Sequence, residues 1–164
     1  MTINNTTTNM AERLGQVLLL REEMLVTAES CTGGGLAELV TQISGSSQWF
    51  ERGYITYSNE AKRECLGVRL ETLETSGAVS EETALEMAQG AISNSHAQIG
   101  VAITGVAGPE GGTADKPVGT VCFAWVHQDG TRRSARAQLQ GDRQRVRQQA
   151  CMLALQGSLD LLES

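Results

Sequence analysis

A serine in a glycine-rich turn is the first residue of this 164-residue chain that could do chemistry. Ser30 lies between the apolar run 24–26 and the glycines 33–35, which precede apolar residues at helical spacing. It is therefore predicted at the point where a strand passes into a helix. There, glycines let a ligand approach the backbone, and the N–H groups at the start of a helix favour negative charge. Such a serine could attack a carbonyl group and have the resulting oxyanion stabilised. The alternative is that Ser30 only caps the helix.

A lysine is the predicted base for this serine, because both histidines, His96 and His127, are expected at surface or sheet-edge positions. Tyr57 closes a segment rich in strand formers, and Lys62 lies in the first turns of the helix expected next. Open α/β sheets place their sites at such strand ends. A lysine desolvated there can be a neutral amine that accepts a proton. The alternative is a solvated surface lysine beside a core or rim tyrosine.

Further residues could bind an anion near this centre. Cys31 is also close to the helix start, but without a neighbouring histidine we interpret it as a packing residue or backbone donor. The loop 105–112 is glycine-rich but matches neither a P-loop nor a dinucleotide motif, so we expect only exposed N–H groups there. Arg143 and Arg147 lie on one face of the last predicted helix, near its start. They are either phosphate or carboxylate ligands or part of a solvated helix face.

The elements that must position these residues alternate between helix and strand. Ser58 or Asn59, Ser80 and Asp142 are predicted helix caps, and Asp129 with Gly130 predicts a hairpin. The order of the elements predicts an α/β fold, a three-layer α/β/α sandwich with a mixed, mostly parallel sheet and one antiparallel hairpin strand. We expect a flexible tail over residues 1–9 and a single domain over residues 10–164, beginning with a helix from Met10.

Composition argues against several other classes of protein. The formal net charge is −6 and the isoelectric point is about 4.9, which argues against a general surface for nucleic acid or anionic membranes. The sequence has no run of spanning length and no secretory signal, so a cytoplasmic protein is predicted. The four cysteines are scattered without paired spacing and only two histidines could join them, so we expect reduced thiols and no metal site.

Seven ordered segments, which together extend over roughly residues 10 to 160, carry a more specific signal. They are residues 28–34, 49–53, 56–62, 77–80, 105–112, 116–121 and 141–143. In this order they resemble the CinA C-terminal domain family, and within it the stand-alone bacterial members that act as nicotinamide-nucleotide amidases.

The resemblance implies hydrolysis of the carboxamide of nicotinamide mononucleotide to nicotinic acid mononucleotide and ammonia, as a step in pyridine nucleotide recycling. It implies Ser30 as the nucleophile, Lys62 and Tyr57 as supporting catalytic residues, and neither a cofactor nor a metal. The residues predicted to bind the substrate are Cys31, Thr32, Gly33, Asn59, Thr104, Gly105, Ala107, Gly108 and Arg143.

Two alternatives remain open from the sequence. One is a non-catalytic nucleotide-binding module, or a partner of competence or damage-response proteins. The other is an amidase for a different pyridine nucleotide. We also predict a homodimer, the commonest assembly of small soluble enzymes, and a small-molecule nucleotide as the only other partner.

Overall fold

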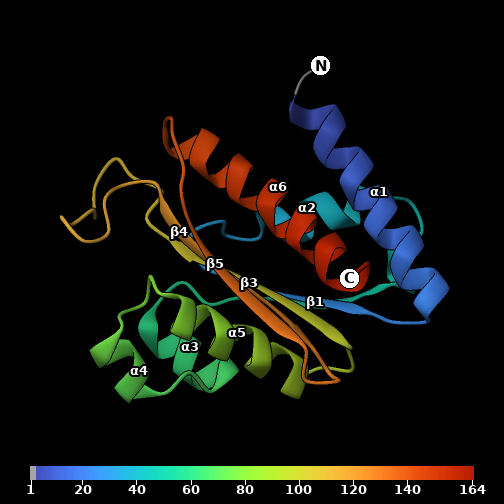
Figure 1. Cartoon of the computed structure of the whole chain (residues 1–164), viewed down its shortest axis with the longest axis horizontal. Coiled ribbons are helices and arrows are strands. Elements are labelled where there is room, and N and C mark those ends of the chain that lie inside the picture. Colours follow the sequence, from blue (N-terminus) through green and yellow to red (C-terminus); the bar gives the residue numbers. More distant parts are fainter. Residues whose placement is uncertain (1–2) are drawn as a thin grey trace.

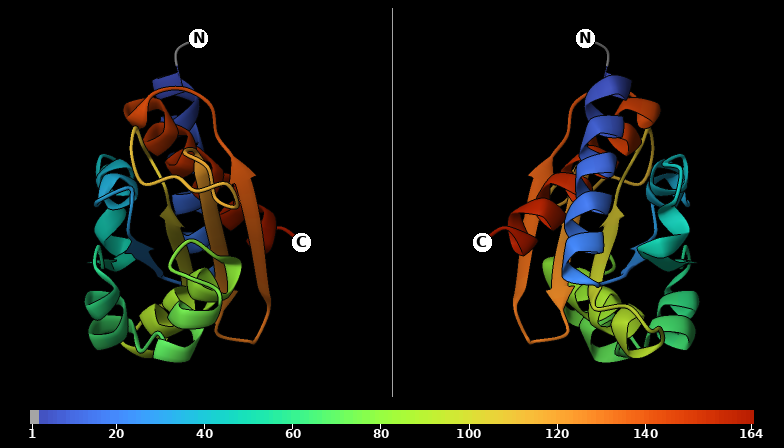
Figure 2. Two further views of the ribbon diagram at one scale, coloured as in Figure 1. Left: turned by 90° about the vertical axis from the view of Figure 1, so that its left-hand side faces the viewer. Right: turned by 90° about the vertical axis from the view of Figure 1, so that its right-hand side faces the viewer.

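A central sheet separates two layers of helices in the computed structural model, which describes residues 3–164 (Figure 1). The helices that cover one face are α1 (Ile3–Arg21), α2 (Gly35–Thr41) and α6 (Arg143–Leu162). Those that cover the other face are α3 (Asn59–Leu66), α4 (Leu70–Thr75) and α5 (Glu81–Ser93). The side views in Figure 2 show the same layers, each of which packs its own apolar cluster against the sheet. The predicted three-layer sandwich is confirmed.

The sheet contains five strands in the order β2-β1-β3-β4-β5. They are β1 (Leu25–Glu29), β2 (Phe50–Ile55), β3 (Ile99–Gly105), β4 (Thr120–His127) and β5 (Arg132–Gln138), with a 3-10 turn η1 (Ser46–Gln48) before β2. Strand β1 pairs parallel with β2 and β3, whereas β4 pairs antiparallel with β3 and β5. Four strands therefore point one way and β4 alone opposes them. The mixed, mostly parallel sheet and the hairpin at Asp129 and Gly130 are confirmed.

The parallel strands β1, β2 and β3 bring distant segments of the chain to one edge of the sheet. All residues of β1 and β4 are buried, and β3 is buried up to its last residue, as their apolar sequences predict. Strand β5 is mostly exposed because it lies at the outer edge. The C-terminal ends of the parallel strands lie together, so Ser30, Thr56 and Val106, which follow these strands, lie at the same end of the sheet. Open α/β sheets bind their ligands at this end.

Local capping fixes where the helices near this edge begin. Ser58 accepts a hydrogen bond from the Ala61 N–H at 3.0 Å, and α3 ends at Gly67, which has a φ of +69°. Ser80 and Asp142 cap α5 and α6 in the same way as Ser58 caps α3. All three predicted caps are confirmed, with Ser58 rather than Asn59 at the start of α3. The cap at Ser58 sets the position of Lys62, one turn further along the helix.

The expected tail at the start of the chain requires a correction. Helix α1 begins at Ile3, not at Met10, so residues 3–9 are helical; residues 1 and 2 lie outside the described range. Thr7 is only 4% exposed and faces a cavity that α2 and α6 also line. The sequence did not predict these first turns because residues 3–9 are polar and lack an apolar stripe. Tertiary packing supports the helix there instead. None of the described helices combines the length and apolarity required to cross a bilayer.

The packing of α3 on α5 generates a first prediction. A Cβ atom at Gly90 of α5 would overlap the backbone carbonyl of Leu66 in α3. We expect Gly90→Ala to lower the free energy of unfolding by about 1–3 kcal/mol, because the overlap outweighs the gain of about 1 kcal/mol in helix propensity. Urea unfolding would measure this, with the exposed Ser93→Ala in the same helix as control. Equal or greater stability of Gly90→Ala would contradict the close approach of the two helices.

Candidate active site

The serine and the lysine singled out in the sequence lie in contact at the C-terminal ends of the parallel strands. The Nζ atom of Lys62 lies 3.0 Å from Oγ of Ser30, although the two residues are 32 positions apart. Ser30 follows β1 directly, and Lys62 lies on α3, which follows β2, the parallel neighbour of β1. Ser30 is 8% exposed and Lys62 is 1% exposed. The structure therefore brings a hydroxyl group and an amine together in a buried position.

Only neutral groups surround the lysine amine. Besides Ser30, Nζ of Lys62 contacts the carbonyl oxygens of Thr56 at 2.9 Å and Tyr57 at 3.3 Å. No carboxylate of the described residues forms an ion pair with it. Burial lowers the pKa of Lys62 below its ordinary value, and the nearby Cys31 opposes this shift weakly. The arrangement favours the neutral amine, the form of lysine that can accept a proton.

The turn after Ser30 is built around a buried carboxylate. Glu29, the last residue of β1, is fully buried, and its carboxylate accepts hydrogen bonds from the N–H groups of Leu36 at 2.9 Å and Ala37 at 3.1 Å. These are donors of the first turn of α2, which has no side-chain cap of its own. Glu29 therefore joins the end of the strand to the start of the helix and holds the intervening turn, residues 30–34, between them.

A cavity of about 280 Å³ opens over the Ser30–Lys62 pair. Its lining includes eight of the residues predicted to act in catalysis or binding besides this pair: Cys31, Tyr57, Asn59, Thr104, Gly105, Ala107, Gly108 and Arg143. These residues come from the ends of β1, β2 and β3, from the loop after β3, and from the starts of α3 and α6. Thr104 is also tied to the cavity wall, because its hydroxyl donates to the carbonyl of Ala78 at 2.8 Å.

Tyr57 and Arg143 form the outer rim of this cavity. The Tyr57 residue is 63% exposed, and its hydroxyl accepts a hydrogen bond from Nη2 of Arg143 at 3.2 Å. Nη1 of Arg143 donates to the carbonyl of Gly108 at 2.9 Å. The hydroxyl of Tyr57 has no hydrogen bond to Ser30 or Lys62; its backbone carbonyl contacts the lysine instead. The phenol is thus placed at the mouth of the cavity rather than beside the reacting pair.

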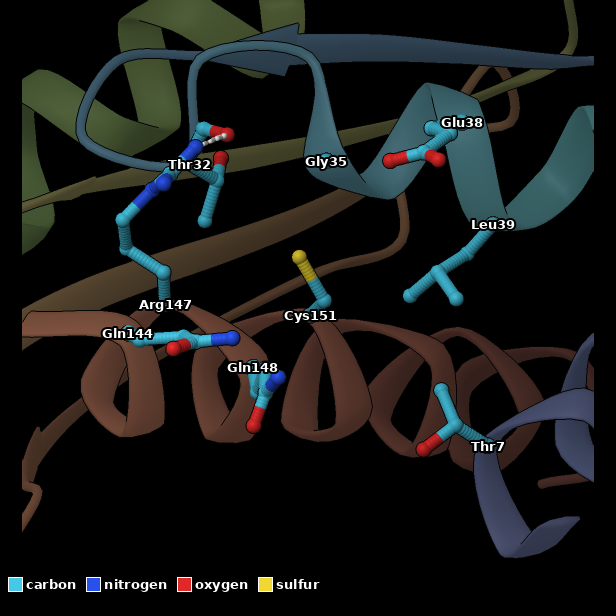
Figure 3. Close-up of a pocket in the computed structure, with 9 residues that line it drawn as sticks. All are labelled: Thr7, Thr32, Gly35, Glu38, Leu39, Gln144, Arg147, Gln148 and Cys151. Carbon is cyan, nitrogen blue, oxygen red and sulfur yellow. Dashed lines mark hydrogen bonds between the residues drawn. The ribbon is translucent and has the colours of Figure 1, made fainter. Parts of the chain in front are cut away.

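Two predicted binding residues lie elsewhere. Thr32 is fully buried and faces a second cavity, of about 250 Å³, behind the Ser30 turn, and Gly33 lines neither cavity (Figure 3). Arg147, predicted as an anion ligand or a solvated residue, instead donates to the carbonyls of Cys31 and Thr32. The reason is the direction of the turn, which aims Cys31 at the first cavity and Thr32 at α6. Arg147 therefore does not line the cavity over Ser30, whereas Arg143, the arginine predicted to bind the substrate, does.

The structure adds lining residues that were not among those predicted to bind the substrate. Ala78 and Val79, from the connection between α4 and α5, and Glu110 and Gly111, from the loop after β3, also line the cavity. Residues 77–80 stood out in the sequence as one of the ordered segments, which was the available signal. Apolar residue types gave no reason to assign them to a site.

The remaining candidates for a nucleophile or base are unsuited to that role or lie outside this cavity. Burial raises the pKa of the Cys31 thiol to about 11, which disfavours a reactive thiolate. His127 is buried beside Glu23 at the opposite edge of the sheet rather than on the surface, and His96 is exposed. All four cysteines are free. Within residues 3–164, no three histidine, cysteine or carboxylate side chains are grouped in a way that could hold a metal ion.

Comparison with known proteins shows the family to which this sequence belongs. The model of the CinA C-terminal domain matches residues 7–162. The chain is 52% identical over 147 residues to the nicotinamide-nucleotide amidohydrolase PncC of Escherichia coli K12, covering 90% of this chain and 89% of the relative. It is 50% identical to the protein of the same name from Pseudomonas putida, covering 94% and 96% of the two chains. A buried hydroxyl–amine pair below an open cavity fits the hydrolytic class to which these names refer.

Solved structures of related proteins have the same fold. The competence/damage inducible protein CihA of Agrobacterium tumefaciens superposes with a TM-score of 0.93 at 43% identity, over 95% of both chains. A CinA superfamily protein from Klebsiella pneumoniae 700603 superposes with a TM-score of 0.91 at 39% identity, over 99% of both chains. The chain belongs to the CinA C-terminal domain family.

The lowered pKa of Lys62 predicts a pH-dependent cost in stability. Between the lowered folded pKa and the unfolded value of about 10.4, the unfolded chain binds the lysine proton and the folded chain does not. Stability that depends on this lysine therefore rises with pH across that window. As pH rises from about 7 to about 10, we expect the free energy of unfolding of the wild type to increase relative to that of Lys62→Met. The increase is at most about 1.4 kcal/mol per pH unit. Urea unfolding of both proteins measures this, and a constant difference would contradict the lowered pKa.

Proposed function

We propose that this protein hydrolyses the carboxamide of a nicotinamide nucleotide, with nicotinamide mononucleotide as the substrate and with nicotinic acid mononucleotide and ammonia as products. The observation that carries the proposal is the 3.0 Å contact between Nζ of Lys62 and Oγ of Ser30 below an open cavity. The names of the relatives from Escherichia coli and Pseudomonas putida supply the substrate and the reaction. As an amidase, the protein would serve pyridine nucleotide recycling.

The hydrogen bonds of the lysine define a path for the proton. A neutral amine has two N–H donors and one lone pair. The carbonyls of Thr56 and Tyr57 can take both donors, so the lone pair is left to accept the hydroxyl proton of Ser30. Transfer is direct in this scheme and needs no relay through the Tyr57 hydroxyl. The role of Tyr57 in catalysis is then to orient the amine through its backbone carbonyl.

The reaction proceeds through an acyl-enzyme. As Lys62 takes the proton, Oγ of Ser30 bonds to the carboxamide carbon, and the C=O electron pair moves to the oxygen. The tetrahedral intermediate collapses, the C–N bond breaks, and Lys62 returns its proton to the leaving nitrogen, which departs as ammonia. Water, deprotonated by Lys62, then attacks the ester and releases nicotinic acid mononucleotide and Ser30. Lysine serves as base and acid in both halves, so the scheme uses no metal or cofactor.

Backbone donors at the Ser30 turn are suited to the oxyanion. The N–H of Ser30 donates to Ile103 and that of Gly33 donates to the carbonyl of Ser30. Among the described residues, no oxygen accepts from the N–H groups of Cys31 or Thr32. We assign the oxyanion to these two groups, because Cys31 lines the cavity and Thr32 is the next residue of the turn. One oxyanion donor is worth about 3 kcal/mol of transition-state stabilisation in enzymes where it has been removed.

The start of α6 is suited to a phosphate group. The side chain of Asp142 caps this helix at the Arg145 N–H, and no residue within the first turn itself is acidic. Arg143 occupies the first helical position, where the helix dipole disfavours a cation. An anion bound there offsets that cost and receives both the guanidinium and the helix N-terminus. Arg143 reaches the mouth of the cavity through Tyr57 and Gly108. We therefore assign the 5′-phosphate to Arg143 and the ribose to the neighbouring rim, near Asn59 and Glu110. The homodimer predicted from the sequence stays a prediction.

Ammonia release from a small panel of substrates tests the proposed function. We expect turnover of nicotinamide mononucleotide, weaker turnover of nicotinamide riboside because it lacks the phosphate that Arg143 would bind, and no loss of activity with a chelator. Ser30→Ala should abolish the activity while the thermal melt is unchanged. Ser47→Ala, an exposed serine before β2 at the other edge of the sheet, is the matched control.

The results separate the alternatives. Binding of nicotinamide mononucleotide without ammonia release would favour a non-catalytic nucleotide-binding module. Turnover of a different pyridine nucleotide would keep the enzyme and change the substrate. Full activity of Ser30→Ala would remove serine from the mechanism.

The two lysines of the chain provide a matched test of the base. We expect Lys62→Arg to lose at least about 10²-fold in kcat, because a guanidinium keeps its proton at all accessible pH values and cannot act as a base. Lys116→Arg should keep wild-type kcat, since Lys116 only donates to the Ser76 carbonyl outside the cavity. Steady-state ammonia assays measure both. Wild-type turnover by Lys62→Arg would contradict the assignment of the base.

A further inference from the structure

An arginine donates hydrogen bonds to two consecutive backbone carbonyl groups of the turn 30–34, the turn that follows Ser30. Arg147 lies in the second turn of α6; its Nε donates to the carbonyl of Cys31 at 3.2 Å and its Nη2 to that of Thr32 at 3.0 Å. Nη2 would lie 3.5 Å from a Cβ atom at Gly33, a residue with a φ of +58°. The guanidinium therefore lies flat against the turn, on the side away from the substrate cavity, as Figure 3 shows for its bond to Thr32.

The carbonyl oxygens of Ser30, Cys31 and Thr32 all accept hydrogen bonds. Ser30 accepts from the Gly33 N–H, Thr32 accepts from the Gly35 N–H as well as from Arg147, and Cys31 accepts from Arg147 alone. In a trans peptide the C=O and the N–H of one unit point in opposite directions. Fixing the Cys31 carbonyl toward α6 thus turns the Thr32 N–H away from α6. Among the described residues, the Thr32 N–H has no acceptor, and the hydrogen bond of Arg147 to the Cys31 carbonyl holds it in this direction.

We propose that Arg147 is a positioning residue of the amidase, which holds the backbone donors next to Ser30 in the orientation that receives the oxyanion. This inference rests on the proposed function. Arg147 does not line the substrate cavity, so it acts through the peptide units of the turn and not by touching the substrate. A single side chain fixes two peptide planes because the guanidinium presents parallel donors, which a lysine ammonium does not.

Two further features support a role beyond bracing a loop. The positive charge of Arg147 acts at Cys31, where it opposes the rise in the thiol pKa caused by burial, so its field reaches the peptide next to the nucleophile. Val146 and Ala150, on either side of Arg147 in α6, are fully buried, so the helix that positions the guanidinium is packed firmly in the core. Hydrogen bonds to charged donors also polarise an amide and strengthen its N–H as a donor.

The cavity behind the turn makes a direct test feasible. It has a volume of about 250 Å³, is open to solvent, and is lined by Gln144, Gln148 and Cys151 of α6 as well as by Arg147 (Figure 3). In Arg147→Ala the cavity is larger by the missing side chain. A free guanidinium ion can then enter from solvent and occupy the position of the lost group.

Arg147→Ala should lower kcat for ammonia release about 10²-fold, the scale of one lost oxyanion donor, with KM changed less than about threefold because no substrate contact is removed. Guanidinium chloride at concentrations well below those that denature should restore kcat, whereas urea, which has the same shape without the charge, should not. Arg145→Ala is the matched control from the same helix: its side chain contacts no carbonyl of the turn, and its kcat should be that of the wild type.

Several outcomes would overturn the role of Arg147. They are an unchanged kcat in Arg147→Ala, a rise in KM alone, or a loss of activity that follows a lowered melting temperature and does not respond to guanidinium. If Arg147→Ala does not fold, Arg147→Lys takes its place, and full kcat in that variant would equally contradict the two-carbonyl clasp.

A second readout separates failure of this inference from failure of the proposed function. Phenylmethylsulfonyl fluoride reacts with an activated serine, with loss of fluoride, and the added mass on Ser30 follows from intact-mass spectrometry without any amide substrate. If the wild type releases no ammonia, the proposed function fails, but slower sulfonylation of Arg147→Ala than of wild type and Arg145→Ala still supports the positioning role. Equal rates in all three proteins would overturn it.

Discussion

The site depends on keeping one lysine amine out of water without a counter-charge. Lys62 is 1% exposed, and its amine meets a hydroxyl and two backbone carbonyls but no carboxylate. An ion pair would have kept the ammonium protonated, whereas burial among neutral acceptors favours the amine. The same burial costs stability, which the helix cap at Ser58 and the packing of α3 on α5 must offset. A strained or costly group that the surrounding fold tolerates is typical of functional sites.

The sheet supplies what such an amine needs. Parallel pairing of β1 with β2 and β3 ends three strands together, so the serine turn, the lysine helix and the glycine-rich loop converge without long excursions. Glu29 then links β1 to the start of α2, and Arg147 links the turn to α6. The turn is held from both of its ends and from behind. The side toward the cavity over Ser30 and Lys62 carries none of these contacts.

The two arginines at the start of α6 illustrate how spacing and role can separate. Their positions place them on one face of one helix, so spacing alone left both open as anion ligands or solvated residues. Arg143, at the first helical position, reaches across the cavity mouth, whereas Arg147, one turn later, reaches the back of the serine turn. A distance of one helical turn, about 5.4 Å, is enough to place them on opposite sides of a single loop. Their surroundings, not their residue type, decide which of them can meet an anion.

The sequence by itself determined most of the elements, the caps at Ser58, Ser80 and Asp142 and the layered fold, because these follow from local periodicity and capping chemistry. Residue type made Ser30 and Lys62 candidates only, and the resemblance to a family favoured them over a capping serine and a solvated lysine. Tertiary structure alone decided the contact between Ser30 and Lys62, since only strand order joins segments 32 positions apart. It also decided the helix over residues 3–9, the outward phenol of Tyr57 and the clasp of Arg147. Each of these depends on which surfaces meet in space, and one-dimensional spacing does not contain that information.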